Sequence, residues 1–513
     1  MAVAAAIIAA APLVAVIVLA IVRPADAAMP AEVIWRYAGA SAMLAGLVAV
    51  GSGLLGAIAA WLVVMFRFPG RDVFAWALAL PLATPAFAIA YGYADLFDVA
   101  GPIRTLLRDT WGVTAWPLEM RSLAGAAIVF SFGFYPYVYL TMRAAFVSQS
   151  VCALEAARTL GAGPFEAFRR VALPMARPAL VAGMALAVME TLADYGAVQF
   201  LGVQTLTTGV VRAWSIYGAP GSAARLALLL MGAAAVLLLV ERLARRDRGF
   251  AASSARWRSL VEIPLSGPAA WAAAAYCALL IFVGLLLPAG WLAFRALAET
   301  PEWDRLARAA LVSLGLGGAG ALLTVLLAAA IAFGARDRPL VGRIASLGYA
   351  TPGAVMAVGL LAPAALLWQG GLATGAMAGL VLLVFAYAAR LMAAGLEPID
   401  AGLSRLSASM LRAPRVLGET EAGGVRRVQL PLITGAVWTA GLLVFVDILK
   451  ELPATLILRP FNFDTLAVLA DRYAADERLG QAAPPALAVV LVALPAVVAL
   501  SGRVRASRPG ASS

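Results

Sequence analysis

Residues 155–161 read Glu-Ala-Ala-Arg-Thr-Leu-Gly, and after nine intervening residues positions 171–174 read Val-Ala-Leu-Pro. A second copy occurs in the other half of the chain: residues 412–418 read Arg-Ala-Pro-Arg-Val-Leu-Gly, and residues 428–431 read Val-Gln-Leu-Pro. The offset between the two copies is 257 residues in both parts. An internal match with this fixed spacing indicates that the chain consists of two homologous halves.

Long apolar stretches surround both copies. Of the 513 residues, 63% are hydrophobic and 13% are charged, which is too little polar surface for a soluble protein of several domains. A helix needs about 20 apolar residues to cross a bilayer, and this length predicts twelve spans in an all-α membrane protein. The spans are expected at 5–22, 39–66, 73–98, 123–142, 179–201, 223–241, 269–294, 309–333, 344–368, 371–394, 433–452 and 483–501.

The first apolar stretch, 2–22, has two interpretations. It could be a signal peptide that is removed, or it could be an uncleaved first helix. The stretch lacks a basic beginning, and it is longer than the roughly 7–15 apolar residues of a signal peptide. We therefore favour the uncleaved helix.

Several classes of function are excluded by residues that the sequence lacks. There is no histidine, which rules out Ser-His-Asp catalysis and histidine-based zinc sites. The two cysteines, Cys152 and Cys277, are far apart, so a disulfide framework is not expected. The single lysine, Lys450, is followed by Glu451, so the chain contains no phosphate-binding loop of the GxxxxGK[ST] type. If the protein uses ATP, another polypeptide hydrolyses it.

The distribution of charge sets the expected orientation. The formal net charge is +11, but the basic residues cluster in short loops beside apolar stretches, so nucleic acid is not an expected partner. A cytoplasmic N-terminus places 24 of the 39 basic residues in cytoplasmic loops, in accordance with the positive-inside rule. Both termini are therefore expected in the cytoplasm. The cytoplasmic loops would be 67–72, 143–178, 242–268, 334–343, 395–432 and 502–513.

The arginine-rich segment 242–268 divides the chain. It is interpreted as a cytoplasmic linker between a first six-helix repeat, 1–241, and a second, 269–513. A further match supports the repeat, because Ala-Thr-Pro occurs at 83–85 and at 350–352, each time with a glycine seven residues beyond the proline, at Gly92 and Gly359. Six spans per repeat is an even number, so the repeats are expected to be parallel in the membrane.

Residues 153–174 are predicted to form two short amphipathic helices joined by a bend. Apolar side chains recur at helical spacing on both sides of the segment 161–164, which reads Gly-Ala-Gly-Pro. Such a projection is a surface that a soluble partner can grip. Alternatively, a basic amphipathic loop could rest on anionic lipid headgroups. The strict repeat at 412–431 favours the soluble partner, because headgroup binding requires no particular placement of glycine and proline.

The repeated motif resembles the signature loop of ABC-importer permeases, through which the membrane subunit docks on its ATPase. In the second copy Arg412 replaces the glutamate and Pro414 replaces the second alanine, so the two loops are expected to be unequal. The resemblance implies a type I importer permease, with an ATPase pair, a periplasmic binding protein and membrane lipids as partners. It implies that the ATPase-coupling residues are Glu155, Ala156, Ala157, Gly161, Pro174, Arg412, Ala413, Gly418 and Pro431.

Other stretches extend this resemblance over nearly the whole chain. Those at 68–71, 135–139, 189–196, 450–455 and 459–464 are similar to the fused two-half permeases of bacterial ferric-iron ABC importers. The resemblance implies an inner-membrane permease that moves ferric iron into the cytoplasm, binds no cofactor itself and relies on a partner for ATP hydrolysis. The alternatives are a fused ABC permease for thiamine or phosphonate, or a proton-coupled secondary transporter, which would have no use for the repeated loop.

Acidic residues within predicted spans need a reason, because a charge at the bilayer centre costs roughly 2.5–3.5 kcal/mol. Glu190 and Asp194 are four residues apart, and so are Asp447 and Glu451. The two pairs are related by the offset of 257. The pairs either line a path for a hard cation, which carboxylates suit, or form structural ion pairs with Lys450 and with arginines. The candidate path residues are Glu190, Asp194, Tyr195, Asp447, Lys450 and Glu451.

Overall fold

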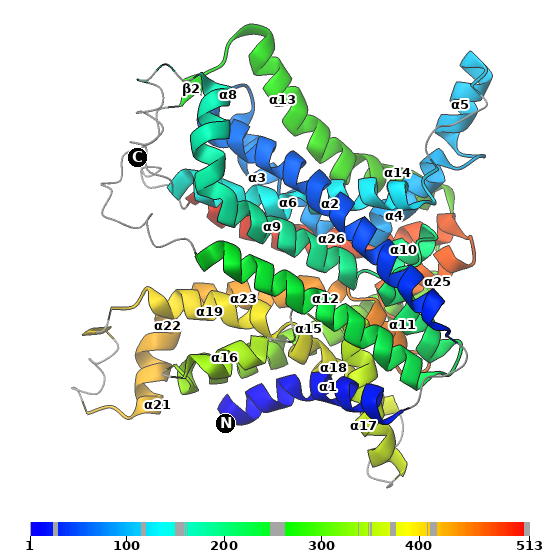
Figure 1. The fold of residues 1–513 in the computed structure, drawn as a ribbon, viewed down its shortest axis with the longest axis vertical. Coiled ribbons are helices and arrows are strands. Elements are labelled where there is room, and N and C mark those ends of the chain that lie inside the picture. The colour runs from blue at the N-terminus through cyan, green and yellow to red at the C-terminus, as the bar shows by residue number, and fades with distance from the viewer. Residues whose placement is uncertain are drawn as a thin grey trace. The chain divides into compact units, whose positions relative to one another are not determined.

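A computed structural model describes the chain within the following ranges. They are 2–23, 29–113, 119–148, 159, 161, 163–246, 262–336, 338–346, 348, 351–369, 376–407, 409–410 and 418–506. Most of these residues lie in helices, as the apolar composition predicts (Figure 1). The reason is physical, since a backbone that crosses lipid has to satisfy its hydrogen bonds internally.

The chain forms two compact units, and each is made of segments that are not adjacent in sequence. Unit 1 comprises Met1–Ile34, Leu206–Gly232 and Pro301–Arg472. Unit 2 comprises Trp35–Thr205, Ala233–Thr300 and Tyr473–Ser513. The units therefore interleave along the sequence, whereas the predicted repeats do not. The repeat borders 1–241, 242–268 and 269–513 stay a prediction.

Unit 1 combines helices of both predicted repeats, and most of them belong to the second. They are α1 (Ala2–Val22), α11 (Leu206–Ser215), α15 (Trp303–Gly334), α16 (Pro339–Ala345), α17 (Gly353–Gln369), α18 (Ala376–Arg390), α19 (Met392–Ser404), α21 (Glu421–Gly424), η6 (Val425–Gln429), α22 (Leu430–Leu432), α23 (Thr434–Leu449), α24 (Pro453–Leu458) and α25 (Leu466–Ala475). Helix α1 packs on α15, α16 and α17, beside which it is drawn in dark blue in Figure 1. The N-terminal helix thus completes a bundle that consists mainly of the second half.

Unit 2 is built in the same way around the first half. Its elements are α2 (Ala31–Met65), β1 (Phe66–Arg67), α3 (Arg71–Ala77), η1 (Leu80–Ala83), α4 (Ala86–Phe97), α5 (Pro102–Trp111), α6 (Leu123–Ser148), α8 (Pro164–Ala167), η2 (Phe168–Ala172), α9 (Leu173–Ala193), α10 (Gly196–Phe200), β2 (Ile263–Pro264), α13 (Gly267–Ile281), η4 (Phe282–Leu286), α14 (Leu287–Ala298) and α26 (Leu479–Ala506). Helix α14 packs on α4 and α26. Helix α12 (Pro220–Arg246) begins in unit 1 and ends in unit 2, and the first turn of α2 and the end of α25 also lie across a border between the units.

The described residues contain seven helices that are long and apolar enough to cross a membrane. The number rises to ten if each of three strongly bent helix pairs counts as one span. The part Ala10–Val22 of α1 is a further apolar helical segment, shorter than these spans. The structure thus shows a multi-pass membrane protein, while the count of twelve spans stays a prediction.

The predicted span 73–98 is not one straight helix. The segments Arg71–Ala83 and Ala86–Trp111 meet at an angle of 89°. The break falls at Thr84 and Pro85, because proline lacks the N–H that would continue the helical ladder, and Pro85 instead precedes the first turn of α4. A second bent pair, Met377–Arg390 and Met392–Ser404, turns by 48°.

The end of the predicted linker 242–268 is attached to unit 2. Strands β1 and β2 are parallel, with Phe66 opposite Ile263 and Arg67 opposite Pro264. Nearby, Arg71 Nη1 lies 2.6 Å from Glu262 Oε1, and Arg71 Nε donates to the carbonyl of Val63 at 2.7 Å. These contacts fix where the chain enters α13.

Candidate functional site

The first copy of the repeated loop can be followed from Gly161 onwards. Glu155, Ala156 and Ala157 lie outside the residues that the structure describes. Gly161 has a φ of 84°, in the left-handed region that glycine occupies without steric cost. Helix α8 begins three residues later with Pro164, a residue that suits the first turn of a helix. The chain therefore turns at Gly161, where the sequence predicts the bend.

Pro174 accounts for the shape of the helix after this bend. Because proline has no N–H, the carbonyl of Arg170 loses its usual donor four residues later. The preceding turn, η2, is widened to a π-helix, and Leu173 N donates to Phe168 O, five residues earlier. Elements α8, η2 and α9 follow one another without interruption, and Phe168–Ala193 forms a single candidate span. The expectation of a separate short helix here, with a span beginning at 179, is therefore wrong.

The first loop is anchored to unit 2 by aromatic side chains. The Phe168 ring lies 5.0 Å from that of Trp61 in α2 and 6.4 Å from that of Phe146 in α6, measured between ring centroids. Trp61 and Phe146 contact each other at 5.4 Å, and they are 7% and 1% exposed. Aromatic contacts of this kind add to the hydrophobic gain from burial. The loop thus continues the hydrophobic core of the unit.

The second copy repeats the local structure in unit 1. Arg412 and Ala413 lie outside the described residues, but Gly418 has a φ of 80°, like Gly161. Elements α21 and η6 follow α8 and η2 at the offset of 257 residues. Leu430 N donates to Val425 O across a second π-turn, and Pro431 stands where Pro174 stands in the first copy. The Leu-Pro of the motif is therefore tied to a widened helical turn in both halves.

The second copy differs where its helix should enter the membrane. Helix α22 ends at Leu432, and the segments Val425–Leu432 and Thr434–Leu449 meet at 67°. The break lies at Ile433, whose φ and ψ are −103° and 10°. The Thr434 hydroxyl lies 3.0 Å and 2.9 Å from the carbonyl oxygens of Leu430 and Pro431, to which it donates. This side chain satisfies carbonyls that a continuous helix would pair with backbone N–H groups.

The candidate path residues of unit 2 lie at the end of α9. Glu190 and Tyr195 are half-buried, and Asp194 follows the last helical residue. Asp194 Oδ1 accepts hydrogen bonds from Ala197 N at 2.9 Å and Val198 N at 3.2 Å. The carboxylate therefore caps the start of α10, a role for which aspartate is well suited.

The candidate path residues of unit 1 are held by ion pairs. Lys450 Nζ lies 3.3 Å from Asp447 Oδ1. Glu451 forms an ion pair with Arg390, and these two side chains are 3% and 14% exposed. Glu451 Oε1 also accepts a hydrogen bond from Ala454 N at 3.0 Å. These contacts agree with the structural interpretation of the acidic residues; their role in a path stays a prediction.

Neither Arg390 nor the aromatic anchor of the first loop is among the residues predicted from the sequence. Arg390 is the last residue of α18 and lies near the end of the predicted span 371–394. An arginine inside an apolar stretch was a usable signal, since such a charge needs a partner. The contact between Phe168 and Trp61 had no signal in the sequence, because 107 residues separate them.

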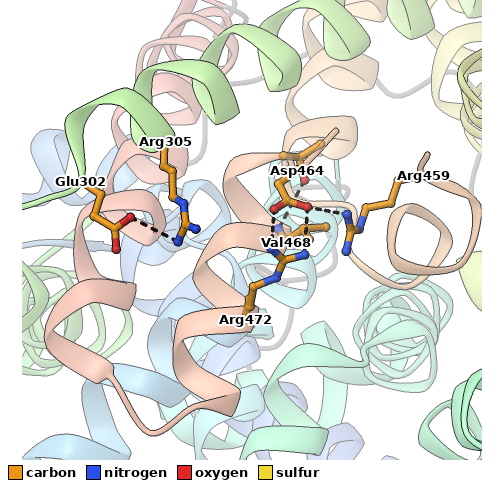
Figure 2. A network of polar contacts seen from close by, with 7 residues as sticks. Glu302, Arg305, Arg459, Asp464, Val468 and Arg472 are labelled. Carbon is orange, nitrogen blue, oxygen red and sulfur yellow. Dashed lines mark hydrogen bonds and ion pairs between the residues drawn. The ribbon is translucent and has the colours of Figure 1, made fainter. Parts of the chain in front are cut away.

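A third group of charges lies between α24 and α25. Figure 2 shows Asp464 between two arginines, with Arg472 Nη1 at 2.9 Å from Oδ2 and Arg459 paired with Oδ1. Glu302 and Arg305 form a separate pair at 3.2 Å. Asp464 closes the stretch 459–464 on which part of the family resemblance rests. Its two ion pairs hold the link between α24 and α25 in a defined conformation.

The described ranges contain no group of three or more Asp, Glu or Cys side chains placed to hold a metal ion. Glu190, Asp194 and Tyr195 belong to unit 2, whereas Asp447, Lys450 and Glu451 belong to unit 1. Within each unit the predicted path residues are neighbours. Asp194 caps a helix, whereas Asp447, Lys450 and Glu451 take part in ion pairs.

Comparison with known proteins places these features in context. Residues 52–296 match the sequence family described as binding-protein-dependent transport system inner membrane component. The chain is 25% identical over 456 residues to the Fe(3+)-transport system permease protein FbpB 2 of Haemophilus influenzae, which covers 86% of this chain and 85% of that protein. It is 30% identical over 221 residues to the molybdenum transport system permease protein ModB of Escherichia coli, covering 42% of this chain and 95% of ModB. It is 34% identical over 162 residues to the sulfate transport system permease protein CysT of Salmonella typhimurium, covering 31% of this chain and 56% of CysT.

Proposed function

Because the chain belongs to the family of binding-protein-dependent transport system inner membrane components, we propose that it is the permease of an ABC importer that moves ferric iron into the cytoplasm. A periplasmic binding protein delivers the substrate. A separate pair of ATPase subunits binds and hydrolyses ATP, and the permease itself catalyses no covalent reaction and binds no cofactor. Family membership argues against the alternative of a proton-coupled secondary transporter.

The two repeated loops support docking of an ATPase. Each loop combines a left-handed glycine, a short helix and a π-turn before the Leu-Pro pair. Arg169 and Arg170 of the first loop, and Arg426 and Arg427 of the second, are exposed. The motif residues Glu155, Ala156 and Ala157 would complete the first docking surface. An ATP-driven change is transmitted only if the ATPase binds one conformation of the permease more tightly than the other.

The proposal of ferric iron as substrate rests on a relative that is similar to this chain over nearly its full length. The relative described as an Fe(3+) permease matches 86% of this chain, whereas the molybdenum and sulfate permeases match 42% and 31% of it. The half-buried carboxylates of Glu190 and Asp447 offer oxygen atoms, which hard cations prefer. Sulfate and molybdate are the competing substrates, because their permeases are more similar over shorter stretches.

The proposed orientation has both termini in the cytoplasm, as the arginine distribution indicates. Reporter fusions after Arg246 and after Arg343 are expected to report cytoplasm, and a fusion near Asp304 is expected to report periplasm. A periplasmic signal at Arg246 would invert the orientation and remove both loops from the reach of an ATPase.

Uptake by reconstituted protein tests the substrate. The permease is co-expressed with candidate ABC ATPase subunits of the same genome, and the complex is placed in proteoliposomes with the binding protein. ATP-dependent uptake is then measured separately for radiolabelled Fe³⁺, molybdate, sulfate and 2-aminoethylphosphonate. We expect Fe³⁺ to accumulate and the anions not to. Accumulation of an anion instead of Fe³⁺ would refute the substrate and leave the importer class intact.

A further inference from the structure

We propose that the two docking loops transmit ATPase motion unequally, the first as a rigid lever fixed by Phe168 and the second through a hinge at Ile433. This inference rests on the proposed function, since it presupposes that an ATPase grips both loops. It assigns Phe168 as a positioning residue, which acts on the spans through Trp61 and Phe146.

The lever is the unbroken helix that begins in the first loop. Phe168–Ala193 is one candidate span, so η2 and α9 move as one rigid helix. Its beginning is packed, because Ala167 is 4% exposed and Phe168, Val171 and Leu173 contact the core that contains Trp61 and Phe146. Closely packed interiors transmit displacement with little compression. Motion of η2 is therefore passed on to α9 and also to α2 and α6.

The hinge is the interruption at the same place of the second copy. Ile433 stands 257 residues after Ala176, which lies inside the continuous helix α9. The segments on the two sides of Ile433 meet at 67°. The Thr434 hydroxyl donates to the carbonyls of Leu430 and Pro431, so these two carbonyls have a hydrogen-bond donor on the N-terminal side of the break.

The hydrophobic core also ends at different places in the two copies. In unit 1, neither η6 nor α22 contains a buried residue, and Leu430 is 39% exposed. Among the described residues of the second loop, Ile433 is the first that belongs to the core of that unit, and it is 2% exposed. Val425 takes the place of Phe168 and is too small to reproduce its aromatic contacts.

The two loops are therefore expected to respond differently when the ATPase displaces them. A displacement of η2 cannot be absorbed within the loop, since the helix is continuous and its side chains are packed. A displacement of η6 can be absorbed by rotation about Ile433 before α23 moves. Hinges of this kind are a few residues at the ends of elements that take up a change in φ and ψ. The first loop is therefore the tighter mechanical connection between ATPase and permease.

Paired spin labels test this difference directly. Labels replace Arg170 and Val181 in one variant, and the equivalent residues Arg427 and Trp438 in another, in a Cys152→Ser background in which the remaining Cys277 is fully buried. Distances are measured in the ATPase complex with and without ATP. We expect the first pair to keep its distance and the second pair to change. A change in the first pair, or an unchanged second pair, would overturn the proposal.

Substitution of Phe168 tests its positioning role. Phe168→Ala is expected to keep ATPase association and ATP hydrolysis but to lower the substrate transported per ATP by about fivefold, a typical size for coupling between sites. Val425→Ala is the matched control and should change this ratio little, while Phe168→Tyr should restore it. Equal ratios for Phe168→Ala and wild type, with folded protein at normal yield, would contradict the inference. Failure of the wild-type chain to bind an ATPase would instead contradict the proposed function.

Discussion

Gly359 of α17 lies directly against the backbone of Pro12 in α1: a Cβ added at Gly359 would stand 2.8 Å from the carbonyl carbon of Pro12. Its counterpart in the repeat, Gly92 of α4, is similarly close to Pro288 of α14, where an added Cβ would stand 3.1 Å from the Pro288 Cα. Each contact lies inside one unit. The same glycine of the repeat thus admits a helix from the opposite half of the sequence in both units.

A methyl group at Gly359 is therefore expected to disturb the packing of α1. Gly359→Ala should lower the free energy of unfolding by about 1–3 kcal/mol, the usual range for overpacking, because the obstacle is backbone. Gly318→Ala in α15 is the matched control, since nothing lies within 4 Å of a Cβ at that position. Thermal unfolding of the purified variants in detergent measures the difference. Equal stability of the two variants would show that α1 does not pack on α17 in solution.

The ion pair of Glu451 with Arg390 leads to a second prediction. Glu451→Gln leaves Arg390, whose side chain is only 14% exposed, without its counter-ion, which should cost about 3–5 kcal/mol of stability. Asp194→Asn is the milder comparison, because Asp194 is half-buried and an amide oxygen can still accept the N–H groups of α10; we expect a loss of about 1 kcal/mol or less.

Folded protein in the membrane and Fe³⁺ uptake should be measured together for these variants. Adding Arg390→Met to Glu451→Gln should restore much of the lost stability, because no buried charge then remains unpaired. If Glu451→Gln unfolds at the wild-type temperature while uptake falls, the carboxylate belongs to the transport path and the structural explanation is wrong.

The left-handed conformation of Gly161 leads to a third prediction. A Cβ at this position has open space, so the cost of Gly161→Ala is conformational only, about 1 kcal/mol. If the ATPase binds the bent loop, this cost should weaken its association by about fivefold. Gly163→Ala is the control, because Gly163 has equal space and no left-handed φ. Titration of the ATPase against the two variants tests this. Equal affinities would show that the bend at Gly161 does not contribute to ATPase binding.

The sequence was informative wherever a feature depends on local chemistry. The motif copies predicted a bend at the glycine of each loop, and Gly161 and Gly418 indeed share nearly the same φ, 84° and 80°. The break before α4 also had a local signal, since Thr84 precedes a proline. That signal was outweighed by the apolar character of 73–98, which fits a straight span equally well.

Features that depend on contacts distant in sequence could not be predicted. Nothing near Pro12 indicates that α1 packs on α17, because that contact joins residues more than 300 positions apart. The break at Ile433 could not be predicted from the local sequence either. Neither glycine nor proline stands at Ile433 itself, and Thr434 is equally compatible with a continuous helix. Which alternative forms is decided by packing around the helix, and this differs between the two units.

A fourth prediction concerns the ion pair of Arg121 with Glu477, which joins two segments of unit 2 outside the candidate spans. Arg121 Nη1 and Nη2 each lie 2.7 Å from a carboxylate oxygen of Glu477. The hydrogen bonds from Arg121 lower the pKa of Glu477 below its usual value of 4.5, and the same bonds raise the pKa of Arg121. The folded state therefore binds this proton less tightly than the unfolded chain does.

The sign of the pH dependence follows from this shift. Because the pKa of Glu477 is lower in the folded state, the stabilisation is complete above pH 4.5 and is lost as the pH falls through the lowered value. Both side chains are substantially exposed, 40% and 63%, so solvent screening limits the effect to about 1 kcal/mol or less. Wild type should therefore lose slightly more stability than Glu477→Gln between neutral and acidic pH, and high salt should reduce the difference. Parallel melting curves across this pH range at low salt would show that the pair contributes nothing.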